Sequence, residues 1–387
     1  MIVYRGVIER SRLSLLLDAT LRTFGPQPFV WLRAEQKDRQ HLGNGLKFLE
    51  SRPGVSSVHV VDGRITRFRK AISKLRELHA HEDEWTFAIG FSALPYARRL
   101  KTRRLIWCVN GIPEERLLYR NGLKPRVSVW LLWKLIGRGR VPDLTVTVSD
   151  QMSQLICSRT GAHRTLAAPT CVDSVTFAPS PDTERAYMTY LGSGAPWQNL
   201  GWLSATWREV HAMMPEVKFR VISRDKRASV LGTGIDPAAM DITSADSPEA
   251  VAAMLDEALL GFVVRSEDIV NRVSFPTKIG EYLAAGVPPV TTDMAWAPAD
   301  LLRSEGVGVL LKAGTSPKEA ALSIKEAVSE MRSDGNTISE RCIAAAKHLD
   351  RTRWSIQLSD VLSEITGHPV VDGAKVASFD GGRVVRR

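Results

Sequence analysis

The stretch Ser274–Asp293, SFPTKIGEYLAAGVPPVTTD, carries the strongest indications of fold and function in this chain. It reads as a loop, a helix, a loop and a strand. Pro276 suits the first helical turn, where its missing N–H costs nothing, and Gly286 stands where a C-terminal cap is expected. The N-terminus of such a helix attracts anions, and Lys278 in its first turn adds a cation. The stretch therefore predicts either an ordinary capped helix of an α/β protein or a helix that binds phosphate.

Apolar runs alternate with segments of helical period on either side of this stretch, which is typical of βαβ units and a mostly parallel sheet. In the first half, strands are predicted near Met1–Tyr4, Phe29–Leu32, Val58–Val61, Phe87–Gly90, Arg104–Val109 and Leu144–Val148. In the second half they are predicted near Tyr187–Gly192, Lys218–Ser223, Leu259–Val264, Pro289–Thr292 and Gly308–Leu311. The non-periodic stretch Ala168–Thr183 separates the two series, so we expect two Rossmann-like domains.

Length and composition agree with two domains. A chain of 387 residues is too long for one ordinary core, and 44% hydrophobic with 24% charged residues is typical of a globular protein. No apolar run is long enough to span a membrane, and the N-terminus lacks the pattern of a secretory signal. The four scattered cysteines favour a reducing compartment, so a cytoplasmic location is expected.

A net charge of +10 implies attraction to an anionic partner: nucleic acid, a membrane surface or a phosphorylated substrate. The basic residues are dispersed and form no recognised nucleic-acid module, so we expect no nucleic-acid partner. The glycine-rich, basic tail 366–387 is predicted to be disordered.

Ser274–Asp293 resembles the signature of retaining, GT-B-fold glycosyltransferases of family 4 (glycosyl transferases group 1), whose helix reads E-[YA]-[LM]-A-x-G-x-P-V. Three further segments, Val146–Ser149, Ala168–Asp173 and Tyr190–Ser193, resemble family segments in the same order. The resemblance extends from about Leu105 to Leu362.

That resemblance implies the GT-B fold, two Rossmann-like domains with a cleft between them. The expected limits are 1–175 for an acceptor domain, 176–340 for a nucleotide-sugar donor domain, and 341–365 for a C-terminal helix that crosses back to the first domain.

The resemblance also implies site residues. In the family, the glutamate at the position of Glu281 holds the ribose of the donor, and an Arg and a Lys after the first strand of the second domain stabilise charge on the departing diphosphate. Here the corresponding loop, Ser193–Asn199, has no cation. We therefore expect Arg265, which ends a predicted strand, and Lys278 to replace them as catalytic cations, with Ser193 among the donor-binding residues.

Two further departures from the family pattern concern the sugar. A second glutamate eight positions before Glu281 is replaced by Val273, so Asn271, Ser274 or another group of the loop that ends at Thr277 is expected to hold the sugar. In the first domain, Asn110 stands where the family has histidine. It is expected to hydrogen-bond a sugar without transferring a proton. The alternative is that Asn110 simply forms a turn after a strand.

These observations predict a glycosyltransferase that moves a sugar from a nucleotide-diphosphate donor to a glycan, lipid-linked or natural-product acceptor, with retention. No metal cluster or DxD motif is apparent, so we expect no metal and no cofactor beyond the donor. The alternative is a GT-B relative without transferase activity, either a sugar-nucleotide epimerase or a non-catalytic binding protein.

The segment Lys124–Arg140, KPRVSVWLLWKLIGRGR, mixes bulky apolar residues with cations. It is compatible with a helix that lies on an anionic membrane surface and equally with a buried helix of the first domain. Peripheral membrane contact is the expectation that suits a lipid-linked acceptor.

Overall fold

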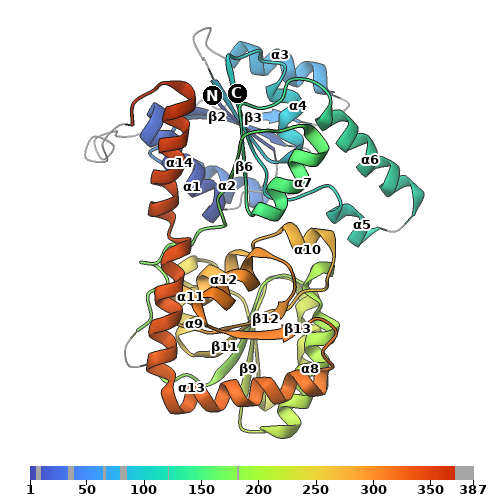
Figure 1. Ribbon diagram of the computed structural model, residues 1–387, viewed down its shortest axis with the longest axis vertical. Coiled ribbons are helices and arrows are strands. Elements are labelled where there is room, and N and C mark those ends of the chain that lie inside the picture. The colour runs from blue at the N-terminus through green and yellow to red at the C-terminus, as the bar shows by residue number, and fades with distance from the viewer. Residues whose placement is uncertain are drawn as a thin grey trace. The chain divides into compact units, whose positions relative to one another are not determined.

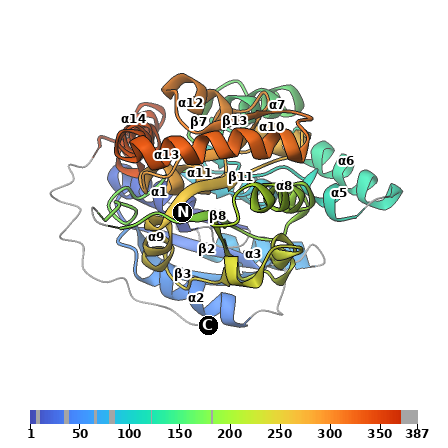
Figure 2. The same ribbon diagram turned by 90° about the horizontal axis from the view of Figure 1, so that it is seen from below.

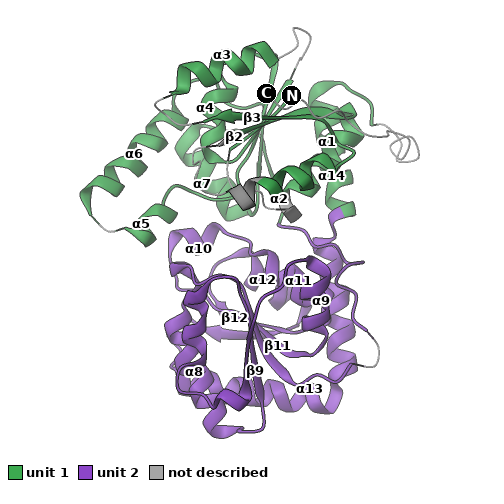
Figure 3. Ribbon diagram, turned by 180° about the vertical axis from the view of Figure 1, so that it is seen from behind, with its two compact units in different colours: residues 1–169, 352–387 green, residues 170–351 purple. Residues whose placement is uncertain are grey.

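The structure is a computed structural model that describes residues 1–5, 10–33, 39–63, 67–78, 85–120, 122–180 and 183–370. Helices and strands alternate along the chain (Figure 1). Contacts divide it into two compact units, Met1–Pro169 with Thr352–Arg387, and Thr170–Arg351. Figure 3 colours these two units. The boundary lies at Pro169, whereas the sequence placed it at residue 175.

Unit 1 contains one parallel sheet with strand order β3-β2-β1-β4-β5-β6-β7. Its strands are β1 (Ile2–Tyr4), β2 (Gln27–Arg33), β3 (Val55–Asp62), β4 (Trp85–Ile89), β5 (Arg104–Cys108), β6 (Leu144–Thr147) and β7 (Thr165–Ala167). Its helices are α1 (Arg10–Phe24), α2 (Arg39–Glu50), α3 (Phe68–Leu78), α4 (Leu94–Ala97), α5 (Glu115–Tyr119), α6 (Leu123–Gly137), α7 (Asp150–Thr160) and α14 (Arg351–Thr366).

Unit 2 contains a second parallel sheet with strand order β10-β9-β8-β11-β12-β13. Its strands are β8 (Tyr187–Leu191), β9 (Lys218–Ile222), β10 (Met240–Thr243), β11 (Ala258–Val263), β12 (Pro289–Asp293) and β13 (Val309–Lys312). Its helices are α8 (Leu200–Met213), α9 (Pro248–Asp256), α10 (Ile269–Val273), α11 (Thr277–Ala284), α12 (Ala297–Glu305) and α13 (Pro317–Ala346).

The α/β class and the two Rossmann-like sheets are confirmed. Every strand that the sequence predicted is present, and two that it did not predict, β7 and β10, lie at the edges of the two sheets. In the second sheet the strand order reverses between β8 and β11. Open parallel sheets bind ligands beyond the carboxyl ends of the strands at such a point, so the loops after β8 and β11 are where a ligand of unit 2 is expected.

The core of unit 2 forms around Trp207 of α8, which is fully buried. Its ring centroid lies 5.0 Å from that of Phe219 on β9 and 5.5 Å from that of Phe262 on β11. The first half of α13 joins this core through its apolar face, with Ile324 and Val328 buried. Figure 2 shows α13 beside α8 and α11. This packing fixes the sheet whose strand ends carry the loops described below.

The C-terminal crossing differs from the single helix expected over 341–365. Instead, α13 ends at Ala346, a short turn follows, and α14 begins at Arg351, the last residue of unit 2, and continues in unit 1 from Thr352. The break occurs because Asp350 takes an extended conformation and the strand-like segment at Val172 pairs with it. Val172 N–H donates to Leu349 O at 2.9 Å, and Arg351 N–H donates to Val172 O at 3.1 Å. Most of the predicted disordered tail, residues 371–387, lies outside the described residues.

Candidate functional site

Helix α11 begins and ends close to the residues that the sequence predicted, and only its first residue differs. Pro276 is the residue before the helix, with an extended backbone, and the first helical residue is Thr277. The sequence had placed Pro276 inside the first turn. At the other end Gly286 has φ +67°, and Val287 N–H donates to Tyr282 O at 2.8 Å, which closes the helix with a left-handed glycine.

Tyr282 fixes this helix to the sheet. Its hydroxyl accepts a hydrogen bond from Leu191 N–H at 2.8 Å and donates to Thr189 O at 3.1 Å, so α11 is joined to β8. The ring lies over Gly261 of β11, where an added Cβ would come within 2.4 Å of it. The start of α11 is therefore held beside the end of β8, at the reversal of the strand order.

Lys278 is buried, with only 8% of its surface exposed. Its Nζ donates to Gln198 Oε1 at 3.0 Å and lies 4.5 Å from the centroid of the Tyr190 ring. Burial, together with the nearby charge of Arg265, lowers the pKa of the Lys278 amine well below its ordinary value, while Glu281 raises it. The buried environment of Lys278 therefore destabilises its charged form, and its partners are the neutral amide of Gln198 and the ring of Tyr190.

Arg265 follows β11 and is also buried, at 5% exposure. Its guanidinium donates to Trp197 O at 3.3 Å, and its Nε has no hydrogen-bond partner among the described residues. Burial lowers the pKa of Arg265 to about 10. Neither Arg265 nor Lys278 forms an ion pair within the described part of the chain, so two buried cations lie together without a carboxylate partner close enough to pair with them.

The loop before α11 is stabilised by its own side chains. Asn271 Nδ2 donates to Ser266 O at 2.9 Å and to Asp268 Oδ2 at 2.8 Å, and Ser274 Oγ donates to Asn271 O at 2.9 Å. Asn271 Oδ1 is buried and has no hydrogen-bond partner among the described residues. Among the loop groups expected to hold a sugar, Asn271 therefore offers a buried carbonyl whose hydrogen-bonding capacity is unused.

Gly192 and the loop after β8 complete the site. Gly192 has φ +146°, and a Cβ there would lie 2.2 Å from Lys278 Nζ, so the backbone approaches the amine as only glycine allows. Ser193 is exposed, and its carbonyl accepts a hydrogen bond from the Tyr190 hydroxyl at 2.7 Å. The sequence singled out Ser193, but Gly192, Tyr190 and Gln198 make the contacts to the lysine. A glutamine in a loop and a tyrosine in a strand carry no sequence signal for this role.

Glu281 lies on α11 one turn after Lys278; part of the residue is exposed, but its carboxyl group is enclosed by protein. Burial raises the pKa of Glu281 to about 7, and the charge of Lys278 opposes that rise. Near neutral pH the carboxyl group is therefore poised between its neutral and ionised forms, and ionisation would favour hydrogen bonds from ligand hydroxyls.

We expect the free energy of unfolding to fall as the pH rises from about 4.5 to about 7, since in this window the folded protein holds a proton on Glu281 that the unfolded chain has lost. The contribution is on the order of 2–3 kcal/mol. Glu281→Gln should remove this part of the pH dependence and be more stable than the wild type at pH above 7. Urea unfolding across this pH range measures it. Glu326→Gln, on an exposed position of α13, is the matched control. Equal slopes for the wild type and Glu281→Gln would contradict the expectation.

Asn110 belongs to unit 1, in the turn after β5, whereas the other predicted site residues belong to unit 2. A Cβ on Gly111 would lie 2.2 Å from the side-chain oxygen Oε1 of Glu115. The residue before Glu115, Glu114, accepts a hydrogen bond from Trp133 Nε1 at 2.8 Å, which joins this turn to α6.

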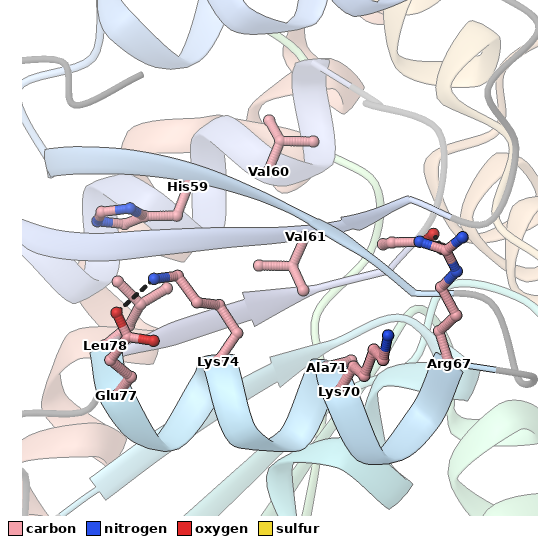
Figure 4. A pocket seen from close by; sticks show the side chains of 10 residues that line it. His59, Val60, Val61, Arg67, Lys70, Ala71, Lys74, Glu77 and Leu78 are labelled. Atoms are coloured by element: carbon pink, nitrogen blue, oxygen red, sulfur yellow. Dashed lines mark hydrogen bonds and ion pairs between the residues drawn. The ribbon is translucent and has the colours of Figure 1, made fainter. Parts of the chain in front are cut away.

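A separate cavity of about 360 Å³ lies between β3 and α3 in unit 1. Figure 4 shows its lining, in which Lys74 donates to Glu77 and Arg67 pairs with Asp62 at 3.4 Å. These cations have carboxylate partners in the same cavity. It contains none of the site residues that the sequence predicted.

Comparison with known proteins supports the assignment of fold and family. Residues 185–330 match the family model described as glycosyl transferases group 1. No curated protein sequence matches the chain. A sucrose-phosphate synthase from Thermosynechococcus elongatus is similar over 95% of this chain and 99% of that one, with a TM-score of 0.70 and 11% identity. Anabaena HepE in complex with UDP-glucose is similar over 94% and 99%, with a TM-score of 0.70 and 16% identity. The OtsA apo structure covers 96% and 99%, with a TM-score of 0.63 and 10% identity.

The fold and these comparisons define a class: the chain has the GT-B fold shared with these solved structures, as the resemblance of Ser274–Asp293 predicted. Its second unit, over residues 185–330, is of the group 1 glycosyl transferase type.

Proposed function

We propose that the protein transfers a sugar from a nucleotide-diphosphate donor to a glycan, lipid-linked or natural-product acceptor, with retention and without a metal ion. The observation that carries the proposal is the pair of buried cations, Arg265 and Lys278, held at the reversal of the strand order without an ion-pair partner among the described residues. A diphosphate is an anion that would compensate both. The solved structures of HepE with UDP and UDP-glucose support a nucleotide sugar as the donor.

In this mechanism the cations act on the leaving diphosphate. Negative charge builds on its oxygens as the bond to the sugar breaks, and donors fixed in advance stabilise that charge without reorganisation. The Arg265 guanidinium and the Lys278 amine supply these donors. Approach of the diphosphate would also favour the charged form of Lys278, which burial disfavours. Glu281 accepts hydrogen bonds from ribose hydroxyls, and Asn271 Oδ1 or Ser274 contacts the sugar.

The test is nucleotide release and sugar transfer measured with UDP-, GDP- and ADP-sugars, beside thermal unfolding with each free nucleotide. We expect one nucleotide to raise the melting temperature and its sugar to be hydrolysed or transferred. Stabilisation without turnover by any donor would favour the alternative of a non-catalytic relative, and interconversion of the donor sugar would favour an epimerase. If no nucleotide stabilises the protein, the donor site proposed here is wrong.

A further inference from the structure

One face of α6 is buried and the opposite face is exposed. Val129, Trp133 and Ile136 recur at helical spacing and are buried within unit 1. Trp133 anchors the helix, with its indole N–H on Glu114 and its ring centroid 5.0 Å from that of Phe91. The main-chain carbonyls at the end of α6 are held by Arg98, whose guanidinium donates to Arg138 O at 2.7 Å. The helix is therefore fixed to unit 1 by one side, and its other side is not covered by described residues.

The exposed face of α6 carries a cluster of large apolar side chains, which is unusual for a surface that contacts only water. Leu123 is 78% exposed and Trp130 is 57% exposed. The other exposed apolar residues are Val127, Leu131 and Leu135. Because they recur at intervals of three or four residues, they form one stripe along the helix. Figure 1 and Figure 2 show α5 and α6 extending away from the sheet of unit 1, so this stripe is presented outward.

Cations accompany the stripe, and carboxylates are absent from it. The sequence from Arg116 to Pro142 contains seven Lys and Arg residues and no Asp or Glu. Lys124, Arg126, Lys134 and Arg138 are exposed, and none of them forms an ion pair with another described residue. Lys124, Arg126 and Lys134 lie between the first and last residues of the apolar stripe, so cations are interspersed with it along the helix.

The hollow between α5 and α6 adds a second cationic feature. Arg116, Arg120 and Lys124 line it together with Tyr119 and Leu123, and its volume is about 930 Å³. Three cations together with Tyr119 and Leu123 suit a phosphate head group whose acyl chains lie beside Leu123.

We propose that this face, defined by Leu123, Val127, Trp130, Leu131 and Leu135 with Lys124, Arg126, Lys134 and Arg138, docks on an anionic phospholipid surface. Exposed apolar side chains interspersed with cations match the acyl boundary and the head groups of such a surface. A second copy of the chain fits poorly because pairing two such faces brings like charges together. A nucleic acid would leave the aliphatic stripe without an apolar partner. Contact is peripheral, since no described helix is long and apolar enough to cross a bilayer.

The experiment is flotation of the full chain with phosphatidylglycerol–phosphatidylcholine vesicles and with pure phosphatidylcholine vesicles, at low and high ionic strength. The wild type should bind only the anionic vesicles and be released by salt, which shortens the screening length from about 10 Å at 0.1 M to about 3 Å at 1 M. Lys124→Gln with Lys134→Gln should weaken binding about 25-fold, at about fivefold per cation. Trp130→Ala with Leu131→Ala should weaken it about tenfold.

Matched controls remove the same charge or apolar area elsewhere. The charge control is the double variant Lys318→Gln with Lys325→Gln on α13. The apolar control is Leu322→Ala on α13 with Ile356→Ala on α14. All four positions are exposed, and both controls should leave flotation unchanged. Stabilisation by nucleotide should be equal in all variants because the donor site lies in unit 2, so this test is independent of the proposed function. No binding to anionic vesicles, equal binding to neutral ones, or equal loss in the controls would overturn the proposal. Capture of RNA or an acidic protein without vesicle binding would also overturn it.

Discussion

Replacing Lys278 with methionine is expected to lower kcat/KM about 10²–10³-fold, the usual effect of removing one fixed donor from a developing anion. The same change should not lower the melting temperature of the free protein. Methionine has a similar length, and it leaves no buried amine whose charge must be removed from water. This pair of results would show that Lys278 contributes to catalysis and does not stabilise the fold.

Thermal unfolding of Lys278→Met without ligand measures its effect on stability. Donor turnover, and the rise in melting temperature caused by nucleotide, measure its effect on catalysis and on donor binding. The matched control is Lys226→Met, which removes an exposed lysine at the turn after β9 and should change neither quantity substantially. Full activity and full nucleotide stabilisation in Lys278→Met would show that the buried amine does not serve the donor.

Gly192→Ala is expected to have the second large effect. The new methyl group would lie 2.2 Å from Lys278 Nζ and 3.2 Å from the Tyr190 hydroxyl oxygen, and φ of +146° is unfavourable for alanine. We expect a loss of about 1–3 kcal/mol in the free energy of unfolding. We also expect strongly reduced stabilisation by nucleotide, because the amine must leave Gln198.

A double-mutant cycle tests this cause. In a Lys278→Ala background the methyl group of Gly192→Ala no longer meets the amine, so the steric part of its cost should disappear and the two changes should not be additive. Gly201→Ala is the control, since an added Cβ in α8 meets no atom within 4 Å. It should be neutral or stabilising by about 0.5 kcal/mol. Additive effects at Gly192 and Lys278 would show that strain alone explains the loss.

The sequence predicted the buried parallel strands well because each is a continuous apolar run between turn residues. It missed β7, Thr165–Ala167, and β10, Met240–Thr243, which are short edge strands that lack a continuous apolar run. The break between α13 and α14 was also missed, since it depends on pairing between Val172 and Asp350, which are far apart in the chain.

The sequence predicted only those residues of the site whose side-chain type, such as a charged group, itself indicates a functional role. Arg265, Lys278 and Glu281 were identified as charged residues at strand and helix ends, and the structure brings these three together in unit 2. Gln198 and Tyr190 were not identified as site residues. Their role is to contact Lys278, and contact between residues 80 or more positions apart leaves no local pattern in the sequence. The roles assigned to all of the predicted site residues, Ser193, Thr277 and Asn110 included, remain predictions.

The two crossings of the chain, at Pro169–Thr170 and at Arg351–Thr352, make unit 2 an uninterrupted insertion within unit 1. Unit 1 depends on α14, where Ser359 O accepts a hydrogen bond from Thr23 Oγ1 of α1 and Glu364 pairs with Arg164. During synthesis this helix is made after all of unit 2. We therefore expect unit 1 to complete its packing only once α14 has been made, later than unit 2, which reverses the usual order of domain folding.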